Sequence, residues 1–293
     1  MFTQFFGNYL LNQKLVTPEQ LVDAIQDKKN TRMKLGVLAI NAGYMTASQV
    51  ERVHELQSQM DKRIGDIAVE LGYMTEEQVM ELLHSQPLGY LLLGQTLVDK
   101  GYMSNSAFED AINSYKEKFS LTDEDIASNE NSKMDTLVTS LCDFSKTKNP
   151  ELYGEFVSLL VNNLIRFVGD DFTPLDPEYS INSTSFKSTS QSINGQFSIM
   201  TKVFADDATF IEFASRYSGE EILELNEYVE ASGQDFINLH NGLFTVNVSN
   251  NQQVELTLTP PTPLASLTPN EIDNCLILPF QYPFGTVRFS VSL

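Results

Sequence analysis

The residues best suited to chemistry are Asp235 and Asn238, which lie three positions apart in a segment, 221–247, with the apolar spacing of a long helix. Residues three apart share one face of a helix, so the carboxylate and the carboxamide would project together. A carboxylate can pair with a cation, and a carboxamide can both donate to and accept from a water molecule. Taken alone, such a pair on a helix face is usually ordinary solvated surface.

A second set of polar residues occurs in two tandem stretches of 24 residues, 34–57 and 63–86, with five residues between them. Each stretch begins with a cation, an apolar residue and a glycine, and each ends in glutamine. At a helix start this pattern suits a phosphate, because the glycine admits a ligand and the free N–H groups and cation attract it. The glutamines could bond a base edge. The candidates are Lys34, Gly36 and Gln57 in one half-site, and Arg63, Gly65 and Gln86 in the other.

The elements that must position this second set belong to a repeat. Four glycines recur every 29 residues, and three of them are followed seven residues later by another glycine, which predicts four helix-turn-helix units over residues 1–118. The second glycines are expected to end the first helix in a left-handed conformation. A Thr or Ser is expected to cap each second helix, with Gln20 and Gln78 completing capping boxes. The positions are Gly7, Gly36, Gly65 and Gly94, then Gly43, Gly72 and Gly101, with caps at Thr17, Thr46, Thr75 and Ser104.

The tandem stretch resembles the MshEN domain, the N-terminal module of type II secretion and type IV pilus ATPases, over residues 34–86. That family uses an Arg-Leu-Gly motif, a second glycine seven residues on and a terminal glutamine, in tandem with a five-residue spacer. The resemblance implies binding of cyclic di-GMP. Lys34 departs from the family because it lacks the planar fork of arginine. Ile64 replaces the family's Leu, and Ala39 and Ala68 stand where a larger apolar residue is usual. Many such domains only dock proteins, so a ligand-free scaffold is the alternative.

The rest of the chain predicts a linker and a second domain. Residues 119–149 are rich in Ser, Asn and Asp and are interpreted as an acidic linker with a short helix near 134–144. From residue 150 an amphipathic helix begins. Strands are predicted at 192–204, 254–259, 274–280 and 286–293, and helices at 206–217 and 221–247. Residues 150–293 therefore form an α+β domain, with a mostly antiparallel sheet packed by long helices.

Residues 150–293 resemble the CheX/CheC/FliY phosphatase family, whose motif is an acid, two residues, Asn, 22 residues and Pro. Asp235, Asn238 and Pro261 match this spacing. The resemblance implies that Asn238 orients a water and that Asp235 pairs with a lysine of a phosphorylated CheY-like receiver domain. The Mg²⁺ would belong to the receiver, with no cofactor in this chain, and a homodimer through this domain is also implied. The family's acid is Glu, so Asp235 is one methylene short, and Ala231 stands where Asp or Ser is usual.

The amino-acid composition excludes several classes of partner and site. The net charge is −20, and residues 119–293 hold 24 acidic against 8 basic residues, which repels nucleic acid. Neither a run of 18 apolar residues nor a basic N-terminal leader occurs, so we expect a cytoplasmic protein without a membrane span. Two cysteines in 293 residues predict neither a disulfide framework nor a zinc site. Two functions stay open: a receiver phosphatase tuned by its repeats, and a non-enzymatic adaptor or cyclic di-GMP receptor with an inactive phosphatase-like domain.

Overall fold

The structure is a computed structural model that describes residues 2–85, 88–128, 131–142, 144, 147, 149–181, 185–267, 272 and 275–292. The chain divides into two compact units, Phe2–Lys133 and Met134–Leu293. The division falls inside the stretch interpreted as a linker, and the described part of that stretch carries two helices, α9 (Asp123–Ser128) and α10 (Asn131–Leu141). Each unit is described separately below.

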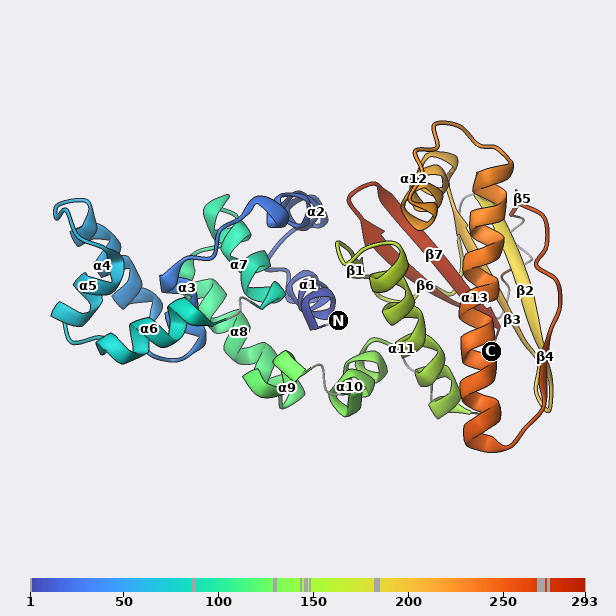
Figure 1. Ribbon diagram of the computed structural model, residues 1–293, viewed down its shortest axis with the longest axis horizontal. Coiled ribbons are helices and arrows are strands. Elements are labelled where there is room, and N and C mark those ends of the chain that lie inside the picture. The colour runs from blue at the N-terminus through green and yellow to red at the C-terminus, as the bar shows by residue number, and fades with distance from the viewer. Residues whose placement is uncertain are drawn as a thin grey trace. The chain divides into compact units, whose positions relative to one another are not determined.

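The first unit is helical (Figure 1). Its helices α1 to α8 form four pairs, one pair in each 29-residue period, and a short 3-10 turn (Lys28–Asn30) follows the first pair. Their bounds are α1 (Phe2–Asn12) and α2 (Pro18–Asp27), α3 (Leu35–Asn41) and α4 (Ala47–Gln57), α5 (Ile64–Glu70) and α6 (Glu76–His84), and α7 (Gly89–Asp99) and α8 (Asn105–Phe119).

The turn within each pair follows the local chemistry of the sequence. Gly43, Gly72 and Gly101 have φ angles of +68°, +70° and +71°, which confirms the expected left-handed turns. Lys14 adopts the same conformation in the first pair, with φ at +56°. The capping boxes expected at Thr17 and Thr75 are confirmed, and Thr46 with Gln49 forms a third. Local signals therefore define where these helices begin and end.

The first glycine of the second, third and fourth periods has a different role. A Cβ atom at Gly36 would lie 2.7 Å from Val50 Cγ1, and one at Gly65 would lie 2.9 Å from Val79 Cγ1. At Gly94 a Cβ would fall 1.8 Å from the Phe108 ring. These glycines let the two helices of a pair approach each other closely. Gly36 and Gly65 are thus accounted for by packing, without a ligand at the backbone.

The second unit confirms the expected α+β class with an antiparallel sheet. The strand order is β1-β6-β7-β3-β2-β4, with β5 beside β2, and the paired strands run antiparallel. Helices α11, α12 and α13 pack on one face of this sheet (Figure 1). The bounds are β1 (Thr173–Pro174), β2 (Lys187–Gly195), β3 (Ile199–Ala205), β4 (Leu256–Leu258), β5 (Ala265–Ser266), β6 (Cys275–Tyr282), β7 (Gly285–Ser292), α11 (Pro150–Phe167), α12 (Asp207–Ser218) and α13 (Glu227–Gln252).

Two predicted elements in this unit are displaced. The segment 192–204, predicted as a strand with a turn at its start, comprises the end of β2, the hairpin turn and most of β3, because β2 already begins at Lys187 and ends at Gly195. The long helix expected at 221–247 is α13, which starts later because the Asn226 side chain accepts from the N–H groups of Tyr228 and Val229. The chain before Asn226 is an exposed, glutamate-rich loop.

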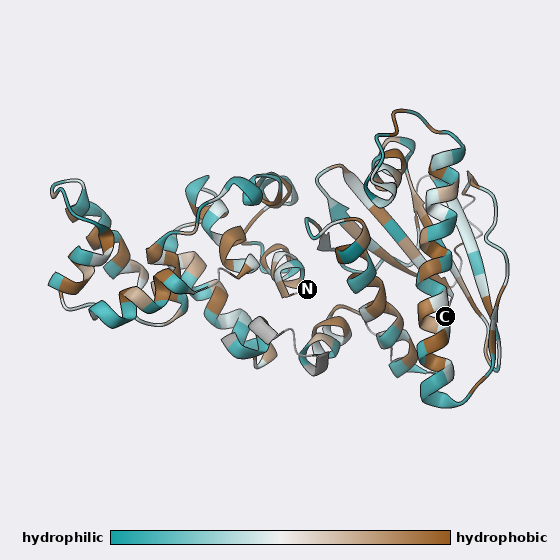
Figure 2. Cartoon of the chain, in the orientation of Figure 1, coloured by the Kyte–Doolittle hydropathy of each residue, from teal (hydrophilic) through white to brown (hydrophobic). Residues whose placement is uncertain are grey.

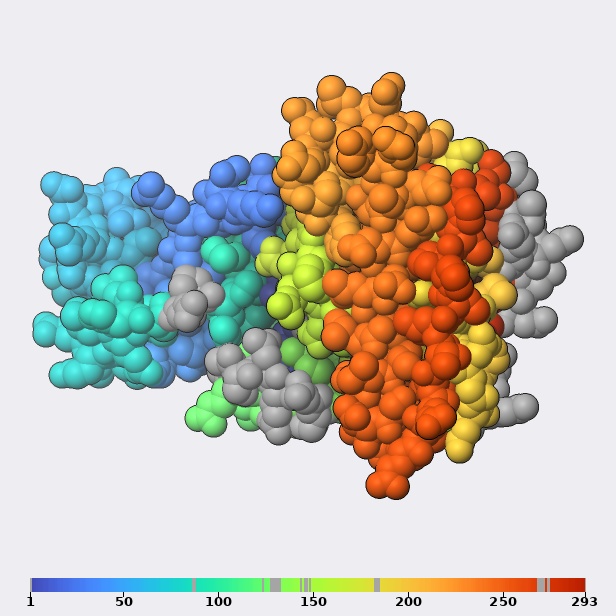
Figure 3. All heavy atoms as spheres, turned by 45° about the vertical axis from the view of Figure 1, so that its right-hand side comes forward, coloured from blue at the N-terminus to red at the C-terminus, as the bar shows by residue number. Residues whose placement is uncertain are grey.

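The long helix α13 is the element that positions the site. Its inner face carries residues spaced by three or four that are buried against the sheet and α12, among them Val229, Phe236, Phe244 and Val248. Figure 2 shows that hydrophobic residues recur in bands along this helix. In the space-filling view of Figure 3, α13 and the segment that follows it lie at the surface, so the outer face of the helix meets solvent.

Candidate functional site

Asp235 and Asn238 lie on the outer face of α13, where both are exposed. Their neighbours Phe236 and Ile237 are 0 % and 2 % exposed and anchor this turn of the helix in the core. The Phe236 ring meets those of Phe213 and Phe289 at centroid distances of 5.3 and 5.5 Å. A rigid backbone therefore presents a carboxylate and a carboxamide side by side to solvent.

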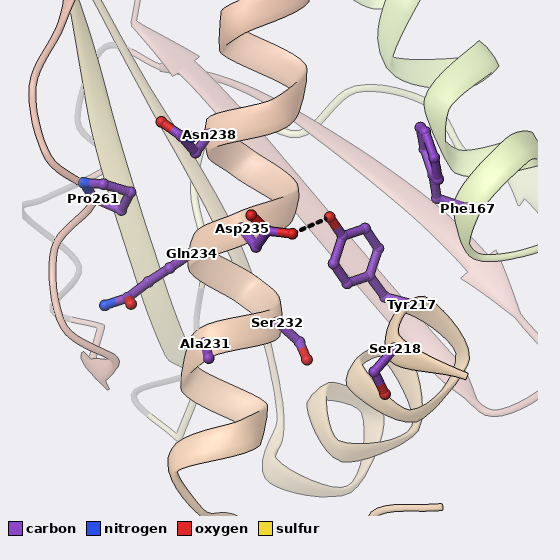
Figure 4. A pocket seen from close by; sticks show the side chains of 9 residues that line it. All are labelled: Phe167, Tyr217, Ser218, Ala231, Ser232, Gln234, Asp235, Asn238 and Pro261. Atoms are coloured by element: carbon purple, nitrogen blue, oxygen red, sulfur yellow. Dashed lines mark hydrogen bonds between the residues drawn. The ribbon is translucent and has the colours of Figure 1, made fainter. Parts of the chain in front are cut away.

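The two residues line an open pocket of about 740 Å³ (Figure 4). The lining also includes Pro261, which is 23 positions after Asn238 in the sequence and lies across the pocket from Tyr217. The pocket thus brings together the three residues of the spaced motif. Its complete described lining is Phe167, Tyr217, Ser218, Ala231, Ser232, Gln234, Asp235, Asn238 and Pro261.

Asp235 is held by a tyrosine that the sequence did not identify as a site residue. The Tyr217 hydroxyl, at the end of α12, donates to Asp235 Oδ2 at 2.6 Å. The Tyr217 ring is fixed edge-on against Phe236, at 5.6 Å between centroids. Burial and the adjacent carboxylate raise the pKa of Tyr217, so its hydroxyl remains a donor. In the described part of the chain, Asp235 Oδ1 has no hydrogen-bond partner and faces the pocket as a free acceptor.

Asn238 is held from behind by Gln191 of β2. Gln191 Nε2 donates to Asn238 Oδ1 at 2.7 Å and to the Thr259 carbonyl at 2.8 Å. Gln191 is only 2 % exposed, although it is a strongly polar side chain. The Asn238 carboxamide is therefore oriented before any ligand arrives.

Pro261 is fixed because the loop that contains it continues beside β2. Thr259 N donates to the Ser192 carbonyl at 2.9 Å, and Thr262 N donates to the Ser190 carbonyl at 2.8 Å. The Thr262 hydroxyl oxygen also accepts from Ser190 N at 2.9 Å. Pro260 and Pro261, between these threonines, have no N–H to donate. The flanking threonines therefore anchor the loop and leave the prolines at the pocket edge.

His240 is close to the motif in sequence but lies outside the pocket. It is 2 % exposed, its Nδ1 accepts a hydrogen bond from Asn163 Nδ2 at 3.1 Å, and its ring meets the Phe156 ring edge-on at 4.5 Å. Burial lowers the pKa of His240 to about 3, so the ring is neutral at physiological pH. Its environment is that of a core residue.

Two candidate ligand residues of the first unit, Lys34 and Gln57, make contacts within the protein. Lys34 Nζ pairs with Asp99 Oδ1 at 2.5 Å, and Gln57 Nε2 donates to the Lys62 carbonyl at 3.3 Å. Arg63 is exposed, whereas Gln86 lies outside the described residues. Since Gly36 and Gly65 serve helix packing, cyclic di-GMP binding stays a prediction of the sequence.

The described ranges contain neither a metal-binding cluster nor a helix able to span a membrane. No cluster of three or more His, Cys, Asp or Glu side chains suitable for a metal ion occurs there. None of the helices in the same ranges is both long and apolar enough to cross a membrane.

Comparison with known proteins finds similarity only among solved structures. No family model matches the sequence, and no curated protein matches it. The similar structures include the chemotaxis protein CheX from Vibrio vulnificus, at 18 % identity over 48 % of this chain and 98 % of that one, with a TM-score of 0.41. The CheX–CheY–BeF3–Mg complex from Borrelia burgdorferi matches at 18 % identity over 48 % and 96 %, with 0.43. Thermotoga maritima FliY matches at 13 % over 52 % and 91 %, with 0.38.

Proposed function

We propose that this protein hydrolyses the aspartyl phosphate of a CheY-like receiver domain. The observation that carries the proposal is the pair Asp235 and Asn238, exposed together on one turn of a helix whose inner face is anchored in the core, in a pocket that Pro261 also lines. An exposed helix face can enter the shallow phosphorylation site of a partner, whereas a deep pocket would suit a small substrate. The open form of this pocket fits the first case.

The reaction requires few groups from this chain. In a phosphorylated receiver, an Asp carboxylate carries the phosphoryl group, and the receiver's own Mg²⁺ and Lys neutralise the phosphoryl oxygens. Hydrolysis needs a water in line with the phosphorus: its oxygen bonds to phosphorus, the bond to the Asp carboxylate breaks, and phosphate leaves. Positioning supplies most of the catalysis in phosphoryl transfer. Asn238 would orient the water, and Asp235 would pair with the receiver's lysine.

A direct attack by water fits the pocket better than a covalent intermediate. Ser218 and Ser232 are the hydroxyl side chains in the lining besides Tyr217. A serine nucleophile needs an adjacent base such as His or Lys, and neither residue type is among the described lining residues. Tyr217 is engaged by Asp235. The carboxamide of Asn238 is thus the group best able to act on a water.

The deciding experiment follows the loss of phosphate from a CheY-like receiver phosphorylated with phosphoramidate and freed of excess donor. We expect this protein to accelerate the decay and Asn238→Ala to abolish at least 90 % of that acceleration. Asn247→Ala is the matched control, because Asn247 is an exposed asparagine farther along α13. No acceleration by the wild type, or equal rates for wild type and Asn238→Ala, would contradict the proposal.

The same experiment distinguishes the alternative of a non-enzymatic adaptor. An adaptor would bind the phosphorylated receiver and leave its decay rate unchanged, or slow the decay by shielding the phosphoryl group. Saturation binding measured alongside the decay separates the two functions.

The helical unit has its own tests. Regulation by cyclic di-GMP would require the decay rate to change when the nucleotide is added. Docking would require loss of receiver or partner binding when the unit is altered.

A further inference from the structure

Behind Asn238 lies a chain of buried polar side chains that spans α13 and two strands. Gln191 of β2, Thr201 of β3 and Asn241 of α13 are 2 %, 2 % and 0 % exposed. Asn241 Nδ2 donates to Gln191 Oε1 at 2.9 Å and to Thr201 Oγ1 at 2.8 Å. Gln191 Nε2 then donates to Asn238 Oδ1 at 2.7 Å. The exposed amide of the site is therefore the outer end of an internal hydrogen-bond chain.

The direction of this chain is fixed by backbone groups. The Thr259 carbonyl can only accept, so the Gln191 atom that contacts it at 2.8 Å must be the donor Nε2. The Thr201 hydroxyl donates its proton to the backbone carbonyl of Gln191 at 3.1 Å, so the hydroxyl oxygen accepts from Asn241 Nδ2. Because Nε2 of Gln191 also reaches Asn238, the Asn238 atom that faces it must be the acceptor Oδ1.

We propose that Gln191 is a positioning residue for the hydrolysis, and this inference rests on the proposed function. Gln191 occupies one of the two acceptor positions of Asn238 Oδ1. The other position remains to accept an O–H of the attacking water, whose lone pair then faces phosphorus. Asn238 Nδ2 points outward and donates to a phosphoryl oxygen. A reversed amide would present its donor to the strand and lose this arrangement.

The energetics of the buried hydrogen-bond chain also support a positioning role for Gln191. Burying polar side chains is favourable only where every group is paired, and apolar residues of similar size would serve stability at least as well. Here Asn241 Oδ1 is buried without a hydrogen-bond partner in the described part of the chain. An incompletely satisfied chain of amides is a poor device for stability. Its consistent direction toward Asn238 gives it a role in orienting that side chain.

Two variants test Gln191. Gln191→Glu places an acceptor where Nε2 lies, so it opposes Oδ1 of Asn238 and favours the reversed amide. Gln191→Leu removes the contact altogether. We expect both to lower the maximal decay rate of the phosphorylated receiver at least tenfold, and to leave the half-saturating protein concentration within about twofold, because Asp235 still docks.

A matched control separates positioning from general damage to the core. Asn163→Leu removes another buried amide, the partner of His240, which does not contact Asn238. We expect Asn163→Leu to lower the unfolding midpoint by a similar amount and to keep the wild-type decay rate. In a double-mutant cycle, Gln191→Leu should cost no further rate once Asn238→Ala is present, because Gln191 acts through Asn238.

A second measurement needs no receiver. In ¹⁵N spectra of the wild-type full chain, the side-chain NH₂ of Gln191 should be protected from solvent exchange, and that of Asn238 should exchange freely. In Gln191→Leu or Gln191→Glu, the Asn238 side-chain resonances should shift. Protected Asn238 amide protons in the wild type, or decay rates for both Gln191 variants within twofold of wild type, would overturn the inference. Failure of the wild type to accelerate decay would instead refute the proposed function, and the spectra would still report the amide orientation.

Discussion

The Tyr217 hydroxyl donates to Asp235 Oδ2 at 2.6 Å and links the end of α12 to the middle of α13. Hydrogen bonds from a hydroxyl to a carboxylate are short and stronger than those between neutral groups. This bond fixes one oxygen of the Asp235 side chain and so holds the carboxylate in one orientation.

Tyr217→Phe should therefore weaken docking. The variant keeps the ring contacts with Phe236 and Phe167 and removes only the hydrogen bond. A hydrogen bond to a charged group contributes about 1.5 kcal/mol, so we expect the half-saturating concentration in the receiver-decay assay to rise about tenfold. Tyr228→Phe is the control, since Tyr228 is 65 % exposed. An unchanged concentration for Tyr217→Phe would mean that the free Asp235 side chain docks equally well.

The charge of Asp235 should matter more than its hydrogen bond. Asp235→Asn keeps an acceptor for Tyr217 but removes the partner of the receiver's lysine, so we expect the half-saturating concentration to rise more than about tenfold. The difference between wild type and variant should shrink as salt is raised from 0.05 to 0.5 M, because exposed ion pairs are screened. Glu151→Gln removes the same charge from the first turn of α11, away from the pocket, and serves as the control. Equal salt dependence in all three proteins would argue against an ion pair at Asp235.

The parts of the site that local spacing defines were predictable. Asp235 and Asn238 share a helix face because of the helical repeat alone. Pro261 was expected at the site only from the resemblance to the motif of the phosphatase family. The turns and caps of the first unit were predictable for the same reason. Left-handed glycines and Thr–Gln capping boxes need only neighbours within a few residues.

The residues that support the site depend on contacts between distant segments. Gln191 meets Asn238 across 47 positions of the chain, and Tyr217 meets Asp235 across 18. Strand β2 has the sequence KSTSQSING, in which most of the buried positions are polar, so hydrophobic alternation does not reveal it. The packing role of Gly36 also depends on such a contact, because the sequence alone does not identify Val50 as the side chain opposite it.

His240 makes the stability of the second unit sensitive to acid. Burial lowers its pKa to about 3 in the folded protein, whereas an unfolded histidine titrates near 6.5. Between these values the unfolded chain binds a proton that the folded chain does not, so stability is lost as the pH falls from 6.5 toward 3. The linkage gives a slope of about 1.4 kcal/mol per pH unit within this window.

The histidine contribution can be isolated by difference. The free energy of unfolding of the second unit is measured in urea at pH 7, 6, 5 and 4, with hydrogen exchange of α11 and α13 as the probe. It should fall less steeply with falling pH in His240→Gln than in wild type. The glutamine oxygen can still accept from Asn163. His84→Gln replaces an exposed histidine and should keep the wild-type slope. Parallel slopes for wild type and His240→Gln would show that other groups cause the acid sensitivity.

Gly36→Ala should destabilise the first unit through the contact with Val50. The added Cβ would lie 2.7 Å from Val50 Cγ1, so α3 and α4 must separate or Val50 must move. Such overpacking costs about 1–3 kcal/mol, which exceeds the gain of about 1 kcal/mol from replacing a helical glycine with alanine. Reduced protection of α3 and α4 amides from hydrogen exchange would report the loss.

Val50→Ala is the rescue that identifies the cause. In a chain that carries Gly36→Ala, it removes the clashing methyl groups, so the double variant should be at least about 1 kcal/mol more stable than the sum of the single effects predicts. Gly43→Ala is the contrasting case: its Cβ meets nothing within 4 Å, and its cost comes from a φ of +68°. Val50→Ala should therefore leave the Gly43→Ala cost unchanged. Additive effects of Gly36→Ala and Val50→Ala would show that Gly36 is not retained for packing, and the interpretation of this position as a ligand-approach glycine would regain support.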